Sequence, residues 1–313
     1  MKISILMAAY NGEKYIYNQL KSISLQTRKP DEIIICDDCS KDGTLDVIRK
    51  FQSDNPNLKI IVTVNNQNIG YAANFIKAFT LSTGELLFFS DQDDVWLPKK
   101  IEEMSRQFDN NNDIGGLVCD FELIDGDNKI IGKQKRHTKK ALISKVSFNE
   151  MVHSFRCGGL NFAVRRDFVD RYKSFILMNE LSHDVPLGII ISSQGMLYKT
   201  NQIYVQHRVH SNNATKPVYD IFERLGDVEK QIKASRNKMK WLEKCEEVVK
   251  DNLSAKELEN YKHAICYYKK SLYALENRNI NMLIKLCFLN NPMIDNKISL
   301  FNVITLIINK KER

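Results

Sequence analysis

Strand-like and helix-like stretches alternate four times in about ninety residues at the start of the chain, and this alternation limits the possible folds. The strand-like runs are rich in apolar residues and span Ile3–Ala9, Asp31–Cys36, Leu58–Val64 and Glu85–Ser90. Turn residues and an amphipathic helical pattern follow each run. Strands joined by helices pair in parallel, so we predict an α/β fold with a Rossmann-like, mostly parallel sheet.

The loops that follow these strands lie near Tyr10, Asp38, Asn68 and Asp93. Right-handed crossovers put the carboxyl ends of parallel strands on one edge of the sheet. Ligands of open α/β sheets bind outside that edge. We therefore expect these four loops to build the ligand site of the chain.

Three carboxylates, those of Asp91, Asp93 and Asp94, follow the fourth strand directly. Carboxylates this close repel one another, and burial adds to the cost of their charges. A divalent cation such as Mg²⁺ or Mn²⁺ would neutralise the cluster, because both ions accept oxygen ligands. The alternative is a solvated acidic turn that caps the helix beginning near Pro98. The surrounding loops favour the metal site.

A change in pattern divides the chain into two parts. A strand-like run over Gly116–Ile124 and another over Met196–His207 continue the α/β pattern. Further on, apolar residues recur at helical spacing. We predict an α/β domain over residues 1–215 and an α-helical C-terminal region over residues 216–313.

Positive charge is concentrated in this C-terminal region. From Lys216 to the end, 19 Lys and Arg stand against 13 Asp and Glu, a balance of +6 within a total of +8. No nucleic-acid-binding motif accompanies the charge, so we expect no nucleic-acid partner. Two apolar runs, Met282–Leu289 and Ile298–Ile308, are too short to cross a bilayer. We predict a region that binds an anionic membrane surface, with packing on the catalytic domain or on a second copy in a homodimer as alternatives.

The seven cysteines indicate a reducing compartment. They are scattered along the chain without the spacing of a disulfide framework. We therefore expect a cytoplasmic protein, held peripherally on the inner face of the cell membrane if the C-terminal region binds lipid.

Four motifs occur in order along the first part of the chain. They are Ile5–Asn11, the pair Asp37-Asp38, the run Asn68-x-Gly70-x-x-x-Asn74, and Ser90–Trp96. Together they resemble the family 2 inverting glycosyltransferases. The form Asp-Gln-Asp-Asp-Val-Trp is similar to the bacterial rhamnosyltransferase-like branch, which builds surface polysaccharide. The resemblance covers about residues 1–213.

This resemblance implies a GT-A fold that binds a nucleotide-diphosphate sugar, UDP- or dTDP-linked, together with Mn²⁺ or Mg²⁺. Asp38 would bind the nucleotide base, with Tyr10 on or near it, and Asp91 would turn toward the ribose. Asp93 would be the direct metal ligand, and His207 would complete the metal site with Asp91. The residues implied on the nucleotide-sugar side are Ala8, Tyr10, Glu13, Asp38, Asn68, Gly70, Asn74, Asp91 and Gln92.

On the acceptor side, the resemblance implies that Asp184 is the catalytic base, with Gly158, Gly159 and His183 nearby. An inverting transfer needs such a carboxylate to take the proton of the attacking hydroxyl. Other roles remain open for these residues. Asp184 could cap a helix, His207 could be an ordinary strand histidine, and Asp38 could cap the helix after Ser40.

Three departures from the family pattern stand out. Cys39 follows the Asp-Asp pair where the family often has glycine, and Ala73 precedes Asn74 where arginine is common. Val185 replaces the usual aromatic residue after His-Asp. These departures concern the diphosphate contacts and the acceptor more than the chemistry.

The predicted function is metal-dependent, inverting transfer of a hexosyl or deoxyhexosyl group to a hydroxyl of a lipid-linked glycan in surface polysaccharide synthesis. One alternative is a nucleotidyltransferase, which also presents acids at the end of a nucleotide-binding strand. It should carry a Gly-rich loop with Lys or Arg after the first strand, and Ala9–Glu13 has no such composition. The other alternative is a sugar-nucleotide-binding protein without turnover.

Overall fold

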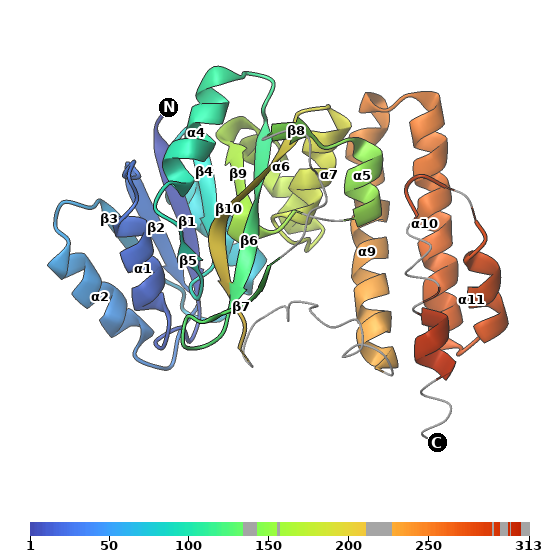
Figure 1. Ribbon diagram of the computed structural model, residues 1–313, viewed down its shortest axis with the longest axis horizontal. Coiled ribbons are helices and arrows are strands. Elements are labelled where there is room, and N and C mark those ends of the chain that lie inside the picture. The colour runs from blue at the N-terminus through green and yellow to red at the C-terminus, as the bar shows by residue number, and fades with distance from the viewer. Residues whose placement is uncertain are drawn as a thin grey trace. The chain divides into compact units, whose positions relative to one another are not determined.

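The computed structural model describes residues 1–133, 143–154, 157–210, 227–289, 291–294, 300 and 302–307 (Figure 1). The chain divides into two compact units. Unit 1 comprises Met1–Val146, Cys157–Ile191 and Gly195–Asn213, and unit 2 comprises Ser147–Arg156, Ser192–Gln194 and Ala214–Arg313. Unit 2 takes two short segments, Ser147–Arg156 and Ser192–Gln194, from within residues 1–215.

The first half of unit 1 is the predicted strand–helix alternation. Strands β1, β2 and β4 are buried along their whole length, apart from half-buried Ala8, because helices cover both faces of a parallel sheet. The pairs β1–β2, β2–β3 and β1–β4 are parallel, in the order β3-β2-β1-β4. The elements are β1 (Ile3–Ala9), α1 (Ile16–Ser24), β2 (Glu32–Asp37), α2 (Thr44–Asp54), β3 (Ile60–Val64), α3 (Tyr71–Leu81) and β4 (Leu86–Ser90).

The second half extends the same sheet with strands of both directions. Strand β9 pairs antiparallel with both β4 and β6, β10 runs parallel to β6, and β5 pairs antiparallel with β10. The elements are β5 (Val95–Trp96), α4 (Lys100–Asn110), β6 (Gly116–Ile124), β7 (Ile130–Lys133), β8 (Ile143–Lys145), η1 (Gly159–Asn161), β9 (Phe162–Arg165), α6 (Arg166–Met178), α7 (Val185–Ser193) and β10 (Leu197–Arg208). The predicted sheet of the GT-A type is confirmed. It is mostly parallel in its first half, and the antiparallel strands of its second half make it a mixed sheet.

Two apolar layers hold unit 1 together. One layer joins Ile5 and Met7 of β1 to α1, α2 and α4, and Trp96 packs within it, as expected for a residue beneath the acidic loop. On the other face α3 contacts β1 and β2. Each fully buried Ile or Phe side chain contributes about 1.5–3 kcal/mol, so these layers set the frame on which the carboxyl-end loops stand.

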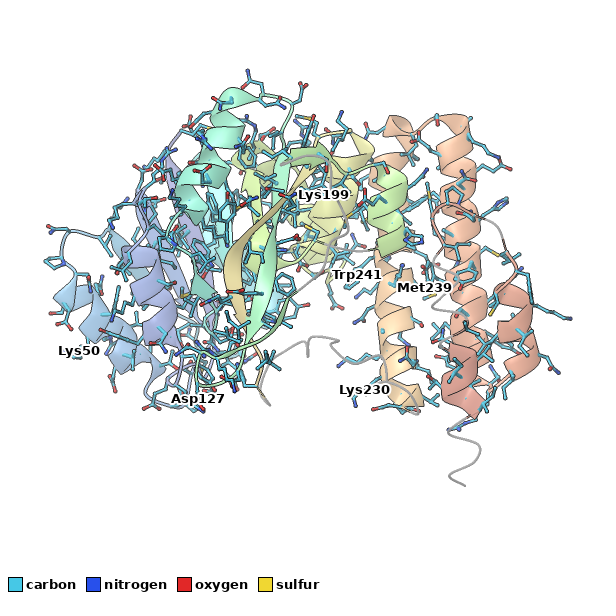
Figure 2. The ribbon with its side chains drawn as sticks, in the orientation of Figure 1. Lys50, Asp127, Lys199, Lys230, Met239 and Trp241 are labelled. Carbon is cyan, nitrogen blue, oxygen red and sulfur yellow. The ribbon has the colours of Figure 1, made fainter. Side chains whose placement is uncertain are left out.

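Unit 2 is helical in its described part. Its elements are α5 (Phe148–Ser154), α9 (Val228–Val249), η2 (Lys250–Asn252), α10 (Ala255–Glu276) and α11 (Ile280–Leu286). Ser254 begins α10 with a capping box to Glu257, and the hydroxyl of buried Tyr261 donates to the carbonyl of Leu242 in α9 at 2.8 Å. Figure 2 labels Trp241, which is half-buried on α9. The predicted helical C-terminal region is confirmed, and short α5 joins it through Phe148, whose ring lies 5.2 Å from that of Tyr261.

No helix in the described residues combines the length and the hydropathy needed to span a bilayer.

Candidate active site

The carboxyl ends of β1 and β4 are joined by Gln92. Its side chain accepts from the backbone N–H of Tyr10 and donates to the carbonyl of the same residue, both at 2.9 Å. Gly12 leaves room for this arrangement, because a Cβ there would collide with the Gln92 amide. The predicted donor-side residues Tyr10 and Gln92 therefore lie together at the sheet edge where Figure 2 labels Asp127 on the β6–β7 turn.

Asp94 is the most buried acid of the loop, with no exposed surface. Its Oδ1 accepts from Nδ1 of His207 at 2.7 Å and from the backbone N–H of Arg208 at 3.0 Å. Its Oδ2 is buried without a hydrogen-bond partner among the described residues. Burial alone would lower the pKa of His207, but the Asp94 carboxylate outweighs it and the pKa rises to about 9.

Arg208 fixes the same loop from the end of β10. The guanidinium is fully buried and donates to the carbonyls of Asp93 at 2.8 Å and Asp125 at 2.9 Å, and to Oδ1 of Asn128 at 2.6 Å. The last two acceptors belong to the β6–β7 turn. One side chain therefore joins the acidic loop to that hairpin, in a fork geometry that lysine could not reproduce.

Asp93 and Asp91 complete the acidic cluster. Nε2 of His210 lies 2.8 Å from Oδ2 of Asp93. Burial raises the pKa of Asp91 well above its ordinary value, and the neighbouring carboxylates of Asp94 and Asp93 raise it further. Three carboxylates share this loop, and their mutual repulsion contributes to the raised pKa of Asp91.

The residues present fit a divalent metal, but not as a self-contained site. No group of three or more His, Cys, Asp or Glu side chains in the described residues is arranged to hold an ion by itself. The donor set is nevertheless suitable, since carboxylate oxygens stand beside the unsatisfied Oδ2 of Asp94. The Asp94–His207 hydrogen bond leaves Nε2 of His207 for a ligand, and metal-ligating histidines use their other nitrogen in this way. Mg²⁺ and similar ions bind through one or two carboxylates with substrate phosphates as further ligands.

Asp38 serves a different loop. Its Oδ1 accepts from Nδ2 of Asn65 at 2.7 Å and from the N–H of Ile69 at 2.8 Å, and its Oδ2 accepts from the N–H of Gly70 at 2.9 Å. Asn74, also predicted on the donor side, is buried and donates to the carbonyl of Cys36 at 2.7 Å. Both side chains therefore hold the loop between β3 and α3 against the end of β2.

The other predicted donor-side residues border these loops. Asn68 is exposed, and its Oδ1 accepts from the N–H of Gly70 at 3.1 Å. Glu13 is also exposed and accepts from the N–H of Gly43 at 2.9 Å. Ala8 is half-buried in β1. Local backbone packing accounts for the positions of these three residues, and each residue keeps some exposed surface at the sheet edge.

The residues predicted on the acceptor side lie where η1 and the start of α7 come together. Oδ2 of Asp184 accepts from the N–H of Gly159 at 3.0 Å, and its Oδ1 accepts from the N–H of Val185 at 2.7 Å. Asp184 thus immediately precedes α7 and binds backbone N–H groups, as the capping alternative requires. Each carboxylate oxygen carries two lone pairs, so one on each oxygen remains for a substrate. The ring of His183, the residue before Asp184, lies 4.7 Å from the Phe89 ring at the end of β4, two residues before Asp91, so the two acids lie in one neighbourhood.

His183 is buried and aromatic in its surroundings. Its ring lies 4.0 Å from Phe75 and 4.7 Å from Phe89, and neither ring nitrogen has a hydrogen-bond partner among the described residues. A Cβ at Gly159 would lie 2.7 Å from its Nε2, so this glycine permits the packing, whereas Gly158 has more room. Burial lowers the pKa of His183, and the ring is neutral.

Comparison with known proteins decides the family. The model of "Glycosyl transferase family 2" matches residues 4–173, more than half of the chain. The chain belongs to glycosyl transferase family 2.

Several curated proteins of this kind are similar in sequence. An uncharacterized glycosyltransferase of Nostoc sp. is 35% identical over 131 residues, which cover 42% of this chain and 40% of that protein. The dTDP-rhamnosyl transferase RfbG of Shigella flexneri is 31% identical over 179 residues, covering 56% and 58%. The Escherichia coli UDP-Glc:alpha-D-GlcNAc-diphosphoundecaprenol beta-1,3-glucosyltransferase WfgD is 25% identical over 227 residues, covering 72% and 84%. The chain thus spans less than two thirds of the first two of these relatives.

Solved glycosyltransferases share the fold. The mannosyltransferase PcManGT of Pyrobaculum calidifontis, in complex with GDP-Man and Mn²⁺, aligns with a TM-score of 0.63 at 14% identity, over 100% of this chain and 88% of that chain. TarS 1–349 of S. aureus, in complex with UDP-GlcNAc, aligns with a TM-score of 0.56 at 14% identity, over 100% and 92%. At these identities the likeness concerns the fold.

Family membership also explains a strained residue. Cys39 has a φ of 66°, in the left-handed region that glycine adopts without strain. The glycine common after Asp-Asp in family 2 fits this backbone, and the cysteine of this chain costs about 1 kcal/mol there.

Three aromatic or basic residues of the candidate site were not among those predicted from the sequence. Arg208 and His210 hold the acidic loop, and Tyr15 packs beneath them, with its ring 4.7 Å from the Arg208 guanidinium and 4.8 Å from the His210 ring. The available signal was the His207-x-x-His210 spacing at the end of a predicted strand. This spacing indicates a site only once β10 is known to end beside the acidic loop.

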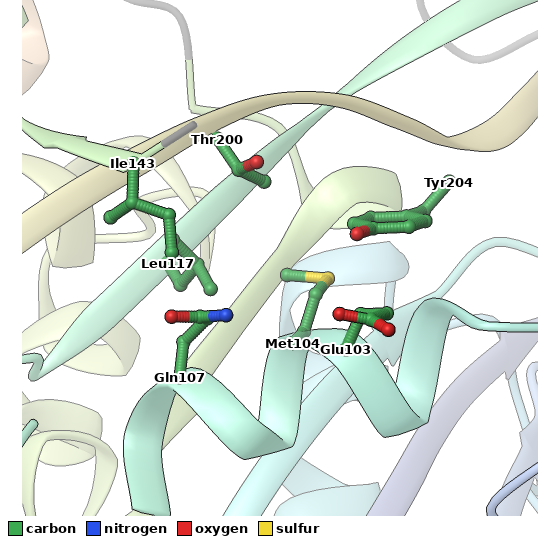
Figure 3. Close-up of a pocket in the computed structure, with 7 residues that line it drawn as sticks. All are labelled: Glu103, Met104, Gln107, Leu117, Ile143, Thr200 and Tyr204. Atoms are coloured by element: carbon green, nitrogen blue, oxygen red, sulfur yellow. The ribbon is translucent and has the colours of Figure 1, made fainter. Parts of the chain in front are cut away.

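A pocket also opens on unit 1 between α4 and the strands β6, β8 and β10 (Figure 3). It contains none of the predicted site residues and no cluster of charges. Its lining is Glu103, Met104, Gln107, Leu117, Ile143, Thr200 and Tyr204. We place the chemistry at the carboxyl-end loops instead.

Proposed function

We propose that this family 2 glycosyltransferase is metal-dependent and inverting, and that it moves a sugar from a nucleotide-diphosphate donor to an acceptor hydroxyl. One observation carries the proposal. The acidic loop after β4 and the carboxylate before α7 come from separate elements, and the ring of His183, which precedes Asp184, packs 4.7 Å from Phe89 at the end of β4. Leaving-group machinery and a base on another element are what an inverting displacement requires.

On the donor side, Asp91 and Asp93 would hold the ion, with His207 as a further ligand through Nε2. Bound there, the ion would offset the negative charge that develops on the departing diphosphate. Arg208 and His210 keep the loop in place, since Arg208 anchors the Asp93 carbonyl and His210 contacts the Asp93 carboxylate. Gln92 fixes the loop to the backbone of Tyr10, whose side chain is 46% exposed. The N–H of Asp38, the residue proposed to bind the nucleotide base, donates to the carbonyl of the adjacent Ala9 at 2.7 Å.

On the acceptor side, Asp184 would take the proton of the attacking hydroxyl. The hydroxyl oxygen forms a bond to the anomeric carbon while the bond from that carbon to the phosphate oxygen breaks, and its electron pair leaves with the diphosphate. Attack from the face opposite the leaving group inverts the configuration. The N–H groups of Gly159 and Val185 orient the carboxylate for this role.

The relatives indicate substrate classes for a test. WfgD is named for transfer to GlcNAc-diphosphoundecaprenol, and RfbG for a dTDP-linked donor. We infer a UDP- or dTDP-linked donor and a lipid-linked glycan acceptor in surface polysaccharide synthesis. The test is release of nucleoside diphosphate from UDP-glucose, UDP-GlcNAc and dTDP-rhamnose, each with a polyprenyl-diphosphate sugar, with Mn²⁺ and with EDTA. Turnover that EDTA abolishes and Mn²⁺ restores supports the proposal, as does a product of inverted anomeric configuration. Binding without turnover for every pair would favour a non-catalytic sugar-nucleotide-binding protein.

We also propose that unit 2 binds the cytoplasmic face of an anionic membrane. Leu300, Ile304 and Ile307 lie at helical spacing on one face and are 55%, 37% and 42% exposed, while Val303 and Leu306 are buried. The surrounding chain carries the +6 balance noted above, and each basic residue near anionic lipid contributes about 1 kcal/mol.

Flotation with phosphatidylglycerol vesicles tests this. We expect binding that weakens with salt, and a further loss in Ile304→Ser/Ile307→Ser, which removes the salt-insensitive apolar part. A protein that stays unbound at low salt and sediments as a dimer would assign the face to a second copy instead.

A further inference from the structure

Tyr71 opens α3 at a point that Asp38 fixes. The preceding residue, Gly70, has a φ of 82°, and its N–H donates to Asp38 Oδ2. The N–H of Ile69 donates to the other oxygen of the same carboxylate. Two hydrogen bonds to a buried acid therefore hold the turn from which the Tyr71 side chain projects.

His183 supports Tyr71 from the other side. The Tyr71 ring meets the His183 ring edge to face, with centroids 6.3 Å apart at 73°. His183 is 3% exposed and packs against Phe75 and Phe89, so it forms a rigid aromatic floor. This floor directly precedes Asp184 in the chain. The Tyr71 ring thus packs against the residue that precedes Asp184, the proposed base.

Despite these supports, Tyr71 is 52% exposed. Its hydroxyl makes no hydrogen bond to the described residues. Burial of part of the side chain, together with the carboxylates of Asp184 and Asp91, raises the pKa of Tyr71 to about 12. The phenol is therefore a neutral donor and acceptor on a ring that packs against His183, next to Asp184.

We propose that Tyr71 is a substrate-contact residue that binds the sugar ring of the donor between Asp91 and Asp184. The inference rests on the function proposed above and names one contact within it. A pyranose has an apolar C–H face and an edge of hydroxyls, which match an exposed aromatic ring with an unengaged phenol. A phosphate matches less well, because the nearby carboxylates repel it.

Paired binding measurements test this inference. The full chain with Mn²⁺ is titrated calorimetrically with a sugar nucleotide that the wild type turns over, for example UDP-glucose, and with the parent diphosphate, UDP. In Tyr71→Ala we expect the sugar nucleotide to bind about tenfold more weakly and transfer kcat/KM to fall at least as much, while UDP affinity changes by less than about twofold. Tyr71→Phe keeps the ring and should retain more activity than Tyr71→Ala.

Tyr17 supplies the matched control. It is 46% exposed on α1 of the same unit and packs edge to face on Phe51 at 5.9 Å, so Tyr17→Ala removes a comparable ring away from the site. Equal weakening of UDP and UDP-glucose in Tyr71→Ala would assign the ring to the nucleotide and overturn the inference. Unchanged binding and kcat/KM would overturn it as well. A wild type that turns over no donor would instead contradict the proposed function, and the UDP and UDP-glucose affinities would still test Tyr71.

Discussion

Asp38 and Asp94 are both buried acids that follow parallel strands, but their carboxylates differ in the hydrogen bonds that they accept. Asp38 is 2% exposed, and both its oxygens accept N–H groups, from Asn65, Ile69 and Gly70. Asp94 is fully buried, but only its Oδ1 is satisfied, by His207 and the Arg208 backbone, while Oδ2 has no hydrogen-bond partner in the described residues. The first acid has both oxygens satisfied by the loop that it holds, whereas the second has one oxygen without a hydrogen-bond partner in a loop with two further carboxylates.

This difference separates stability from activity. A satisfied buried carboxylate stabilises the loop that it binds, so its loss should be seen in unfolding. An acidic cluster with an unsatisfied oxygen raises the free energy of the folded state. Such clusters occur at functional sites, where a bound ligand compensates the charge. We therefore expect changes near Asp38 to act on the free energy of unfolding and changes in the acidic loop to act on turnover.

The largest effect should come from Asp93→Ala. The substitution removes the proposed metal-ligating carboxylate, and we expect transfer with Mn²⁺ to fall by about a thousandfold or more. The melting temperature should change little, because removing a charge from a crowded cluster also relieves repulsion. Rates and thermal unfolding are measured on the same preparation. Near-normal rates in the variant, with or without EDTA, would show that the acidic loop does not hold the metal.

Asp184→Asn should come next in size. The amide cannot accept the proton of the acceptor hydroxyl, so kcat should fall by about a hundredfold to ten-thousandfold. Its NH₂ group also leaves the N–H of Gly159 or of Val185 without an acceptor, so thermal unfolding is measured alongside to separate lost stability from lost turnover. Donor affinity should stay nearly constant, since the base acts mainly in the transition state. Calorimetric titration with the donor separates the two quantities. If donor affinity fell and kcat were kept, Asp184 would belong to the donor side.

Asp38→Asn should lower the stability of the protein and not its turnover. The amide places an NH₂ group among the N–H donors of Ile69 and Gly70 and leaves at least one of them unpaired. We expect the free energy of unfolding to fall by about 3–4 kcal/mol, because charge-assisted hydrogen bonds to a buried group are lost. Chemical denaturation measures this loss. A variant of unchanged stability with weakened nucleotide binding would instead favour Asp38 as a direct contact to the base.

The sequence predicted the strand–helix alternation because each apolar run between turn residues has one favourable place, inside the sheet. The run Gly116–Ile124 coincides with β6, and the predicted strand Met196–His207 differs from β10 by one residue at each end. The antiparallel pairing of β9 with both β4 and β6 was not predicted. Helix α6 was missed. Pairing direction depends on contacts far apart in sequence, and local patterns do not carry that information.

The candidate site shows the same limit. The acidic loop and Asp184 could be identified from their residue types, while the partners of the loop could not. His207 and Asp94 are 113 residues apart, and His210 and Asp93 are 117 apart. Nothing in the sequence distinguishes Arg208 from other strand-end arginines. In the structure its guanidinium donates to the carbonyl of Asp93 and, in the β6–β7 turn, to the carbonyls of Asp125 and Gly126 and to Oδ1 of Asn128. Residues that position a site are recognised by contact, and contact follows from the fold.

Glu32 extends the comparison to a third buried acid, at the opposite end of β2 from Asp38. Burial alone would raise its pKa, but hydrogen bonds from Lys59, Thr83 and Ser4 outweigh it and lower the pKa from 4.5 to about 2. A carboxyl with a lowered folded-state pKa stabilises the protein above its unfolded pKa and loses that contribution on acidification. We expect about 2–3 kcal/mol of unfolding free energy to be lost between pH 4.5 and 2.

Urea unfolding of wild type and Glu32→Gln at several pH values measures this contribution. The variant should be less stable at pH 7 and show a flatter pH dependence over the window from 4.5 to 2, because the amide cannot be protonated there. Asp54→Asn is the matched control, since Asp54 is 53% exposed in its pair with Lys50, labelled in Figure 2, and should change stability by less than about 0.5 kcal/mol. If Glu32→Gln kept the acid-dependent loss of the wild type, other carboxylates would cause it. A satisfied buried acid would then not be a source of stability in this sheet, and the contrast between Asp38 and Asp94 would lose its thermodynamic basis.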